Sequence, residues 1–437
     1  MPLSPPARDT ATVPGAMPVP VPVSASVSVA PVPVSPAASA TGGIPYADRL
    51  AGVDALLALL HDRRSDVLGL LTEVCAHRAA EYEIDAAAAT LRGAAAEVAR
   101  WSPPPLERAA VFMPSNVVLY SYVLYLVVPS LYVGDVAFRP SSQVCRPTMA
   151  LHRLLAPAHG LPIRLEDVSQ RAFTENSAAP ADLVVFTGRF HNAETVRGAV
   201  GTDAMFVFLG QGANPIVVGP DADVDRAVDD AVGVRLLNSG QDCLGPDALF
   251  VHEDVVDDFT GKLADRIDGL KPGASTDPAA DYGPLYYDSA WDGAFQFLTR
   301  HRDRIRHGGS LDARTRTVQP TMLVSRLGEQ PPLTEFFAPV FNVVAWSDPA
   351  PLRTLLATAP YAERSLGASV YGTVPDPVLE VLRRRCTVTY EATLESVDDG
   401  NEPFGGYGRA ANYIAHQGRV DSEPVLLSKA VAERWKR

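Results

Sequence analysis

The sequence has few cysteines, no long apolar run and no excess of positive charge. Its four cysteines, Cys75, Cys145, Cys243 and Cys386, are widely spaced. This spacing indicates neither a disulfide framework nor a metal site, so we expect reduced thiols in a cytoplasmic protein. No stretch reaches the roughly 20 apolar residues that cross a bilayer, so we expect no membrane span. A formal net charge of -13 argues against a nucleic-acid partner, because duplex binding relies on basic contacts to phosphate.

Residues 1–44 are rich in Pro, Val, Ala and Ser. Proline at every second or third position, as in Pro18–Val23, prevents helices and interrupts sheet pairing. We expect a disordered tail, with a docking arm for a partner as the alternative. The segment does not resemble a secretory signal, since prolines break its apolar part and Arg8 is its only basic residue.

The remaining chain changes from a helical to an alternating pattern. Over 46–101, apolar residues such as Val53, Leu56 and Leu60 recur at helical spacing. After Pro103–Pro105, short apolar runs are separated by helix-like or turn-rich stretches. The predicted strands are 109–113, 136–138, 183–186, 205–209, 248–252 and 341–345. Strands that alternate with helices predict an α/β fold with parallel sheets.

The length and composition indicate two domains after the tail. A chain of 437 residues with 47% hydrophobic content can bury two cores. We expect a nucleotide-binding domain over 45–211, a catalytic domain over 212–410, and a C-terminal segment over 411–437 used for packing or oligomerisation. The run Gly210-Gln211-Gly212 lacks the third glycine and the acidic residue of the usual dinucleotide fingerprint, so alone it is weak evidence.

Several sequence blocks, taken in order, resemble the aldehyde dehydrogenase superfamily over about 113–429. These blocks are Met113-Pro114-Ser115-Asn116, Gly134–Ser141, Phe186-Thr187-Gly188, Leu209–Pro215, Asp221–Asp225, Asn238–Cys243, Glu335–Val340 and Pro403–Tyr407. Their order and spacing carry the resemblance. It implies an aldehyde dehydrogenase-like α/β fold with a Rossmann-like cofactor domain and an α/β catalytic domain. It also implies an NAD(P)-dependent oxidoreductase.

By this resemblance, Cys243 is a nucleophile that attacks a carbonyl as its thiolate. The Asn116 side-chain amide and the Cys243 backbone N–H would donate hydrogen bonds to the resulting oxyanion. Hydride transfer to or from nicotinamide then leaves or consumes an enzyme thioester. Without the resemblance, a lone cysteine is usually a small buried hydrophobe, and an asparagine before a helix is a good N-cap.

The resemblance also implies a set of cofactor-contacting residues. They are Pro114, Ser115, Arg139, Ser142, Thr187, Gly188, Arg189, Leu209, Gly210, Glu335 and Phe337. Arg139 keeps the positive charge of a family lysine near the adenosine ribose. Ser142 stands where NAD-preferring relatives often have a glutamate, so NADP should be tolerated as well as NAD. Arg189 would reach the pyrophosphate, or would simply be an exposed arginine at a helix start, and Glu335 would hold the nicotinamide ribose.

Leu209 stands where the family has its general-base glutamate. Leucine cannot move a proton, and general-base assistance is worth about a hundredfold to ten-thousandfold, so water should hydrolyse a Cys243 thioester slowly. We therefore favour acyl transfer to or from a thiol, such as coenzyme A or a carrier protein. The substrate would be a small aldehyde or an acyl thioester.

Two alternatives remain for the fate of the acyl group. In one, Glu391 is a relocated base and the product is a carboxylic acid; Glu395 and Asp398 follow it in what could equally be a solvated acidic loop. In the other, the protein is a non-catalytic scaffold, which the intact nucleophile loop disfavours.

The expected oligomer follows from a short connection. Family members often have a protruding hairpin before the Asn116 block, whereas here Arg100–Pro105 leads almost directly into the first strand. Because this hairpin helps to form tetramers in the family, its shortening predicts a homodimer.

Overall fold

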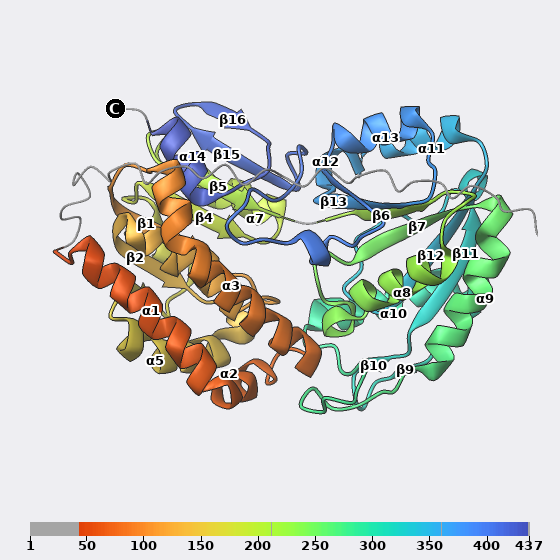
Figure 1. Ribbon diagram of the computed structural model, residues 1–437, viewed down its shortest axis with the longest axis horizontal. Helices are drawn as coiled ribbons and strands as arrows, with labels where there is room; N and C mark the ends of the chain where they lie inside the picture. The colour runs from red at the N-terminus through yellow and green to blue at the C-terminus, as the bar shows by residue number, and fades with distance from the viewer. Residues whose placement is uncertain (1–42, 211, 360, 436–437) are drawn as a thin grey trace, which may run out of the picture. The chain divides into compact units, whose positions relative to one another are not determined.

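The computed structural model describes residues 43–210, 212–359 and 361–435 (Figure 1). The tail predicted over 1–44 therefore lies almost entirely outside the described residues. The described residues form one compact unit with two seven-stranded sheets. The α/β fold expected from the sequence is confirmed.

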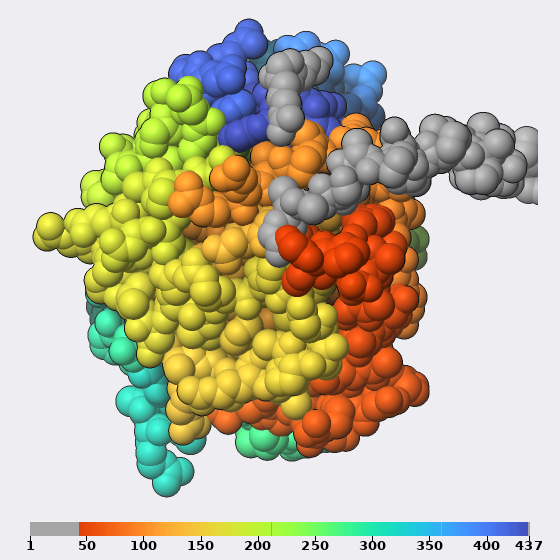
Figure 2. All heavy atoms as spheres, turned by 90° about the vertical axis from the view of Figure 1, so that its left-hand side faces the viewer, coloured from red at the N-terminus to blue at the C-terminus, as the bar shows by residue number. Residues whose placement is uncertain are grey.

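Three helices form the segment predicted to be helical. They are α1 (Tyr46–Asp62), α2 (Arg64–Leu71) and α3 (His77–Trp101). The apolar residues Val53, Leu56 and Leu60 of α1 are buried, as their spacing predicts. α1 packs beside α5 (Cys145–His159), and the two cover one end of the molecule (Figure 2). These helices shield the first sheet from solvent on this side.

The first sheet has the order β16-β15-β5-β4-β1-β2-β3. Its strands are β1 (Leu106–Phe112), β2 (Val133–Arg139), β3 (Ile163–Leu165), β4 (Leu183–Thr187), β5 (Met205–Leu209), β15 (Asn412–His416) and β16 (Arg419–Asp421). The first five are parallel, whereas β15 joins β5 in antiparallel orientation. Short helices α4 (Leu119–Tyr122), α6 (Gln170–Phe173) and α7 (Phe190–Arg197) lie in its connections. The C-terminal segment thus completes the predicted cofactor sheet.

The second sheet has the order β14-β13-β6-β7-β12-β11-β8 and is parallel except for β8. Its strands are β6 (Asn214–Val218), β7 (Pro246–His252), β8 (Ile305–His307), β11 (Thr321–Arg326), β12 (Val340–Trp346), β13 (Gly367–Tyr371) and β14 (Thr387–Tyr390). A separate hairpin consists of β9 (Leu311–Asp312) and β10 (Thr317–Val318).

Helices cover both faces of the second sheet (Figure 1). They are α8 (Val224–Arg235), α9 (Glu253–Gly269), α10 (Asp288–Arg300), α11 (Pro349–Leu356), α12 (Tyr361–Arg364) and α13 (Asp376–Arg383); α14 (Leu427–Arg434) follows the first sheet's last strand. Along β6, Ile216 and Val218 pack in the core of α8 and α9, whereas Val217 packs in the core of α11 and α13. The strand is apolar on both faces because both faces are buried.

All six strands predicted from short apolar runs are present, most of them longer by one to three residues. The domain boundaries at 211 and 410 stay a prediction. No described helix combines the length and the apolarity that a membrane crossing requires.

Candidate active site

A cavity of about 880 Å³ collects nearly every site residue that the sequence predicts. Its wall includes Pro114, Ser115, Asn116, Arg139, Ser142, Thr187, Gly188, Arg189, Leu209, Gly210, Cys243, Glu335 and Phe337. Several of these residues follow the carboxyl ends of β1, β2, β4 and β5, where a parallel sheet offers a ligand site. Glu391 is the one predicted site residue that lies elsewhere.

Cys243 follows a backbone loop held in an unusual conformation. Asn238 and Ser239 have φ angles of 51° and 55°, which are uncommon for residues with a side chain. Their side chains accept hydrogen bonds from the backbone N–H groups of Ala76 (3.0 Å) and Gly283 (2.8 Å), which hold this turn. At Gly240, with φ 83°, a Cβ atom would lie 2.3 Å from the backbone of residue 338. The loop is therefore fixed before any ligand binds.

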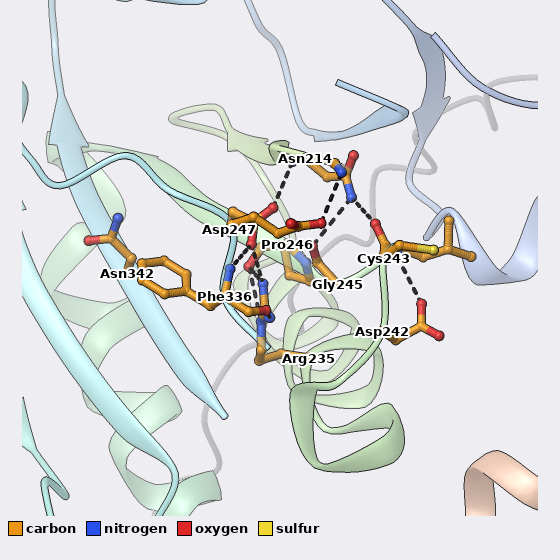
Figure 3. A network of polar contacts seen from close by, with 12 residues as sticks. Asn214, Arg235, Asp242, Cys243, Gly245, Pro246, Asp247, Phe336 and Asn342 are labelled. Carbon is orange, nitrogen blue, oxygen red and sulfur yellow. Dashed lines mark hydrogen bonds and ion pairs between the residues drawn. The ribbon is translucent and has the colours of Figure 1, made fainter. Parts of the chain in front are cut away.

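A buried asparagine braces the nucleophile's own backbone (Figure 3). Asn214, only 1% exposed, donates from Nδ2 to the Cys243 carbonyl oxygen at 2.6 Å and to the Gly245 carbonyl at 3.4 Å. Its Oδ1 accepts the backbone N–H groups of Leu366 and Gly367. The sequence analysis missed this role, although Asn214 stands inside one of the blocks that carry the family resemblance.

A buried ion pair joins the cysteine loop to the segment that holds Glu335 and Phe337. Arg235 is fully buried and donates to the carbonyl oxygens of Pro246 and Phe336, and to Asp247 at 3.2 Å (Figure 3). Asp247 in turn accepts the Phe336 N–H at 2.8 Å. No sequence signal singled out this pair, because neither residue lines the cavity.

One hydrogen-bond donor in the cavity wall has no acceptor among the described residues. It is Nδ2 of Asn116, which is buried. Asn116 does not cap α4, since the N-cap residue is Val118 and no side chain caps that helix. A buried donor without a partner is unfavourable, so Asn116 Nδ2 suits an oxyanion that arrives with the substrate. The backbone N–H of Cys243 lies against its own sulfur and hydrogen-bonds to no other described residue, so it can donate to the same oxyanion.

The Cys243 thiol holds its proton in this environment. Burial raises its pKa well above the ordinary value, and the nearby carboxyl groups of Asp242, Glu335 and Asp398 raise it further. The thiolate is the reactive form, so the cysteine needs activation during turnover. Cys75 and Cys386 are buried and Cys145 is partly exposed; none of the three lines the cavity.

The cofactor half of the cavity has the chemistry that a dinucleotide needs. Arg139 is held by the carbonyl oxygens of Val168 and Pro140, and Arg189 is the N-cap residue of α7. Gly188 has φ 139°, a conformation that side chains disfavour, and brings the backbone to the cavity. Two guanidinium groups and a helix N-terminus in the wall of one cavity suit phosphates. The residues present therefore fit NAD or NADP.

Glu335 also lines this cavity. Its Oε1 accepts the Gly212 backbone N–H at 3.0 Å, shortly after the end of β5. Phe337 packs partly buried against the main core and also lines the cavity. Both positions agree with a site at the end of the first sheet.

Glu391 lies outside the cavity wall, contrary to the arrangement that a relocated base requires. Its backbone has φ 49°, and its carboxylate accepts the Gly372 N–H at 2.7 Å. Leu209 lines the cavity but carries no proton-accepting group. Of Glu391, Glu395 and Asp398, Asp398 lines the cavity, and it accepts a hydrogen bond from the Tyr82 hydroxyl at 2.8 Å. Burial raises the Asp398 pKa.

The comparison with protein families agrees with the family resemblance seen in the sequence. The sequence model of the aldehyde dehydrogenase family matches residues 35–421. The chain belongs to the aldehyde dehydrogenase family.

Two curated relatives are similar to parts of the chain. A 4,4'-diapolycopene-4,4'-dial dehydrogenase of Cytobacillus firmus is 28% identical over 248 residues, which cover 56% of this chain and 53% of that protein. An NADP(+) succinate-semialdehyde dehydrogenase of Mycobacterium avium is 31% identical over 185 residues, which cover 42% of this chain and 36% of that protein. The chain thus spans about half of the first relative's length and about a third of the second's.

Solved structures share the fold over most of its length. The succinate-semialdehyde dehydrogenase of Burkholderia pseudomallei superposes with a TM-score of 0.74 at 22% identity, covering 90% of this chain and 88% of that chain. The glyceraldehyde-3-phosphate dehydrogenase GapN of Methanocaldococcus jannaschii, complexed with NADP, superposes with a TM-score of 0.73 at 17% identity, covering 90% of this chain and 89% of that one. At such identities the likeness shows the fold alone.

Proposed function

We propose that the protein oxidises an aldehyde with NAD or NADP through a covalent intermediate on Cys243. The observation that carries this proposal is the buried, unpartnered donor Asn116 Nδ2 in the wall of the cavity that contains the Cys243 thiol. The thiolate forms a C–S bond with the aldehyde carbon, and the carbonyl electron pair moves onto oxygen. Asn116 Nδ2 and the Cys243 N–H stabilise that oxyanion, and loss of one such donor costs about 3 to 4 kcal/mol. NAD(P)+, when bound, accepts the hydride.

The residues that would hold the cofactor come from four strand ends and the 335–337 segment. Arg139 and Arg189 would neutralise phosphate charge, and the Glu335 carboxylate would accept hydrogen bonds from a ribose. Ser142 leaves room for a 2′-phosphate without repulsion, which supports use of NADP. The Mycobacterium avium relative is named as an NADP(+) enzyme, and the archaeal structure is a complex with NADP.

For the acyl acceptor we propose a thiol, such as coenzyme A or a carrier-protein thiol. Support comes from Leu209, because an attacking thiolate needs no base to activate it. The thiolate would bond to the acyl carbon and release the Cys243 sulfur as its anion. The names of the relatives describe aldehyde dehydrogenases and give no support to this branch.

A second candidate acceptor is water, and the position of Asp398 favours it. This carboxylate lies in the cavity wall and acts electrostatically on Cys243. Burial raises its pKa, which makes it a stronger base than an exposed aspartate. Glu391 is not in a position to perform this role.

The two acceptors are separated by mass spectrometry and steady-state kinetics. Wild-type protein is incubated with an aldehyde panel and NAD(P)+, with and without coenzyme A. A cofactor burst with a persistent acyl mass on Cys243, relieved by coenzyme A, supports the thiol acceptor. Steady turnover in water that is lost in Asp398→Asn but kept in Glu391→Gln supports hydrolysis. Absence of both adduct and turnover contradicts the proposed function.

We also propose that the protein forms a homodimer, on the basis of the short connection before β1. We propose the cytoplasm as its compartment because its four cysteines are widely spaced. α3 ends at Trp101 and β1 begins at Leu106, which leaves no room for a protruding hairpin. Light scattering on the full chain tests the stoichiometry. A mass of one or four subunits contradicts it.

A further inference from the structure

The walls of the cavity carry charges of opposite sign on different elements. Its two described basic residues, Arg139 and Arg189, follow β2 and β4 in the cofactor half. Acidic residues come from α3, from the cysteine loop and from the 398–402 loop. They are Glu83, Glu97, Asp242, Asp398, Asp399 and Glu402. Burial raises the pKa of Glu83 to about 8, so that carboxyl group is neutral at pH 7, and the negative charge of this part of the cavity comes from the other acids.

Structural hydrogen bonds account for two of these acids. Glu83 accepts the backbone N–H groups of Leu119 and Tyr120, and Glu97 accepts hydrogen bonds from Ser428 and Asn401. These bonds fix the start of α4 and the 398–402 loop. Neither carboxyl group needs a ligand to explain it.

Asp242 and Asp398 are different, because they flank the nucleophile without a cation. No lysine, arginine or histidine among the described residues forms an ion pair with either carboxylate. Asp242 accepts only the Leu244 N–H at 2.8 Å, and Asp398 is held by the Tyr82 hydroxyl. Asp242 directly precedes Cys243 in the chain, and both aspartates line the same cavity as the thiol. Partly buried carboxylates without a cationic partner are costly, and a cationic ligand would reduce that cost.

Tyrosine rings complete this end of the cavity. Tyr82, Tyr120, Tyr125 and Tyr287 line it, and burial raises the pKa of Tyr125. Aromatic faces attract ammonium groups, most strongly where water is excluded. The unpartnered Nδ2 of Asn116 marks the carbonyl end of the same space. A substrate would thus place its aldehyde at Asn116 and Cys243, and its other end among tyrosines and carboxylates.

We propose that the substrate is an aldehyde that carries an ammonium group, bound by Asp242 and Asp398. This inference rests on the proposed aldehyde oxidation and specifies its substrate class. An aldehyde with a second, anionic end, such as a semialdehyde of a dicarboxylic acid, would meet repulsion from the same carboxylates. The chain would then differ in substrate from the mycobacterial relatives named for succinate semialdehyde.

Three aldehydes of matched length test the proposal. They are trimethylammoniobutanal, its neutral isostere with carbon in place of nitrogen, and glutarate semialdehyde. We expect kcat/KM to fall from the cationic to the neutral to the anionic aldehyde, by on the order of tenfold at each step. An order in which the anionic or the neutral aldehyde is best overturns the proposal. If no aldehyde reduces NAD(P)+ or labels Cys243, the proposed function itself has failed.

Variants that each remove one carboxylate charge show which groups cause the preference for a cationic aldehyde. In Asp398→Asn and Asp242→Asn, the preference for the cationic over the neutral aldehyde should fall by about tenfold each. Loss of a general base would instead lower kcat/KM for the cationic and the neutral aldehyde equally and leave their ratio unchanged. Asp257→Asn removes the same charge from the exposed surface of α9 and should keep the wild-type ratio. Unchanged ratios in both cavity variants would contradict the assignment.

Discussion

The Asn214 side-chain amide holds the Cys243 carbonyl oxygen at 2.6 Å, so the first strand of the second sheet fixes the nucleophile's backbone. In Asn214→Ala the sulfur and the Cys243 N–H should lose their alignment, and we expect kcat to fall roughly a hundredfold. Asn342→Ala is the matched control, since Asn342 is equally buried but donates to Pro332. Both variants should melt earlier than wild type. Equal kcat values in the two would contradict a positioning role for Asn214.

Asn116→Ala should lower kcat by about a hundredfold to a thousandfold, because one oxyanion donor is lost. The melting temperature should change little, since Asn116 Nδ2 has no protein acceptor to lose. Exposed Asn176 provides the control, and Asn176→Ala should keep wild-type kcat. A large loss of stability with normal kcat would assign Asn116 to the fold instead of the reaction.

Arg235→Met should destabilise the protein strongly, because it leaves Asp247 buried without its cation. Breaking such a pair typically costs about 3 to 5 kcal/mol of unfolding free energy. Denaturant unfolding measures the effect. Arg171→Ala removes an exposed pair with Glu175 and should leave the free energy of unfolding close to that of wild type. Similar losses in the two variants would contradict the importance of the buried pair.

The pH dependence of stability should change in Glu83→Gln. Burial raises the Glu83 pKa to about 8, so the folded state keeps a proton that the unfolded chain releases above its ordinary value near 4.5. The native state thus binds more protons between these pH values, and wild-type stability should fall as pH rises through this window.

Each pH unit in that window should cost wild type up to about 1.4 kcal/mol relative to Glu83→Gln. Denaturant unfolding of both proteins between pH 5 and 9 measures the difference. Glu433→Gln, on the exposed side of α14, should follow the wild-type profile. Parallel profiles for wild type and Glu83→Gln would contradict a neutral Glu83.

Ser142→Glu should shift cofactor use from NADP towards NAD. A carboxylate at this position would accept hydrogen bonds from ribose hydroxyls and repel a 2′-phosphate. We expect the ratio of kcat/KM for NADP to that for NAD to fall by at least about tenfold. Ser141→Glu, at the neighbouring residue of the wall, is the control for position. An unchanged ratio in Ser142→Glu would place the ribose elsewhere.

Short apolar runs predicted the strands well, because a strand that is buried on both faces is apolar throughout its own sequence. The run that became β5 is apolar throughout, since the strand lies inside a sheet that is covered on both faces. The pairing of β15 with β5 was not predictable in this way. It joins Asn412 to Leu209, and nothing local in either segment specifies the other.

Residues that line the cavity were predicted from the sequence. Residues that hold the lining residues in place were missed. Blocks around Asn116 and Cys243 were recognisable, and the structure brings both to one cavity. Asn214 and Arg235 were missed because their role depends on contacts that only folding creates. Glu391 was misplaced for a related reason. Glu391 is close to Asp398 in the sequence. Its backbone, at φ 49°, nevertheless directs its carboxylate to the Gly372 N–H.

The return of β15 to the first sheet also has a consequence for biosynthesis. The outer edge of β5 pairs with β15, so this edge stays open until residue 416 has left the ribosome. At roughly 5 to 20 residues per second, the about 200 residues between the two strands take roughly 10 to 40 s to translate. During that time an apolar strand presents unpaired backbone groups to its surroundings. The sheet that begins first along the chain is therefore the one that is finished last.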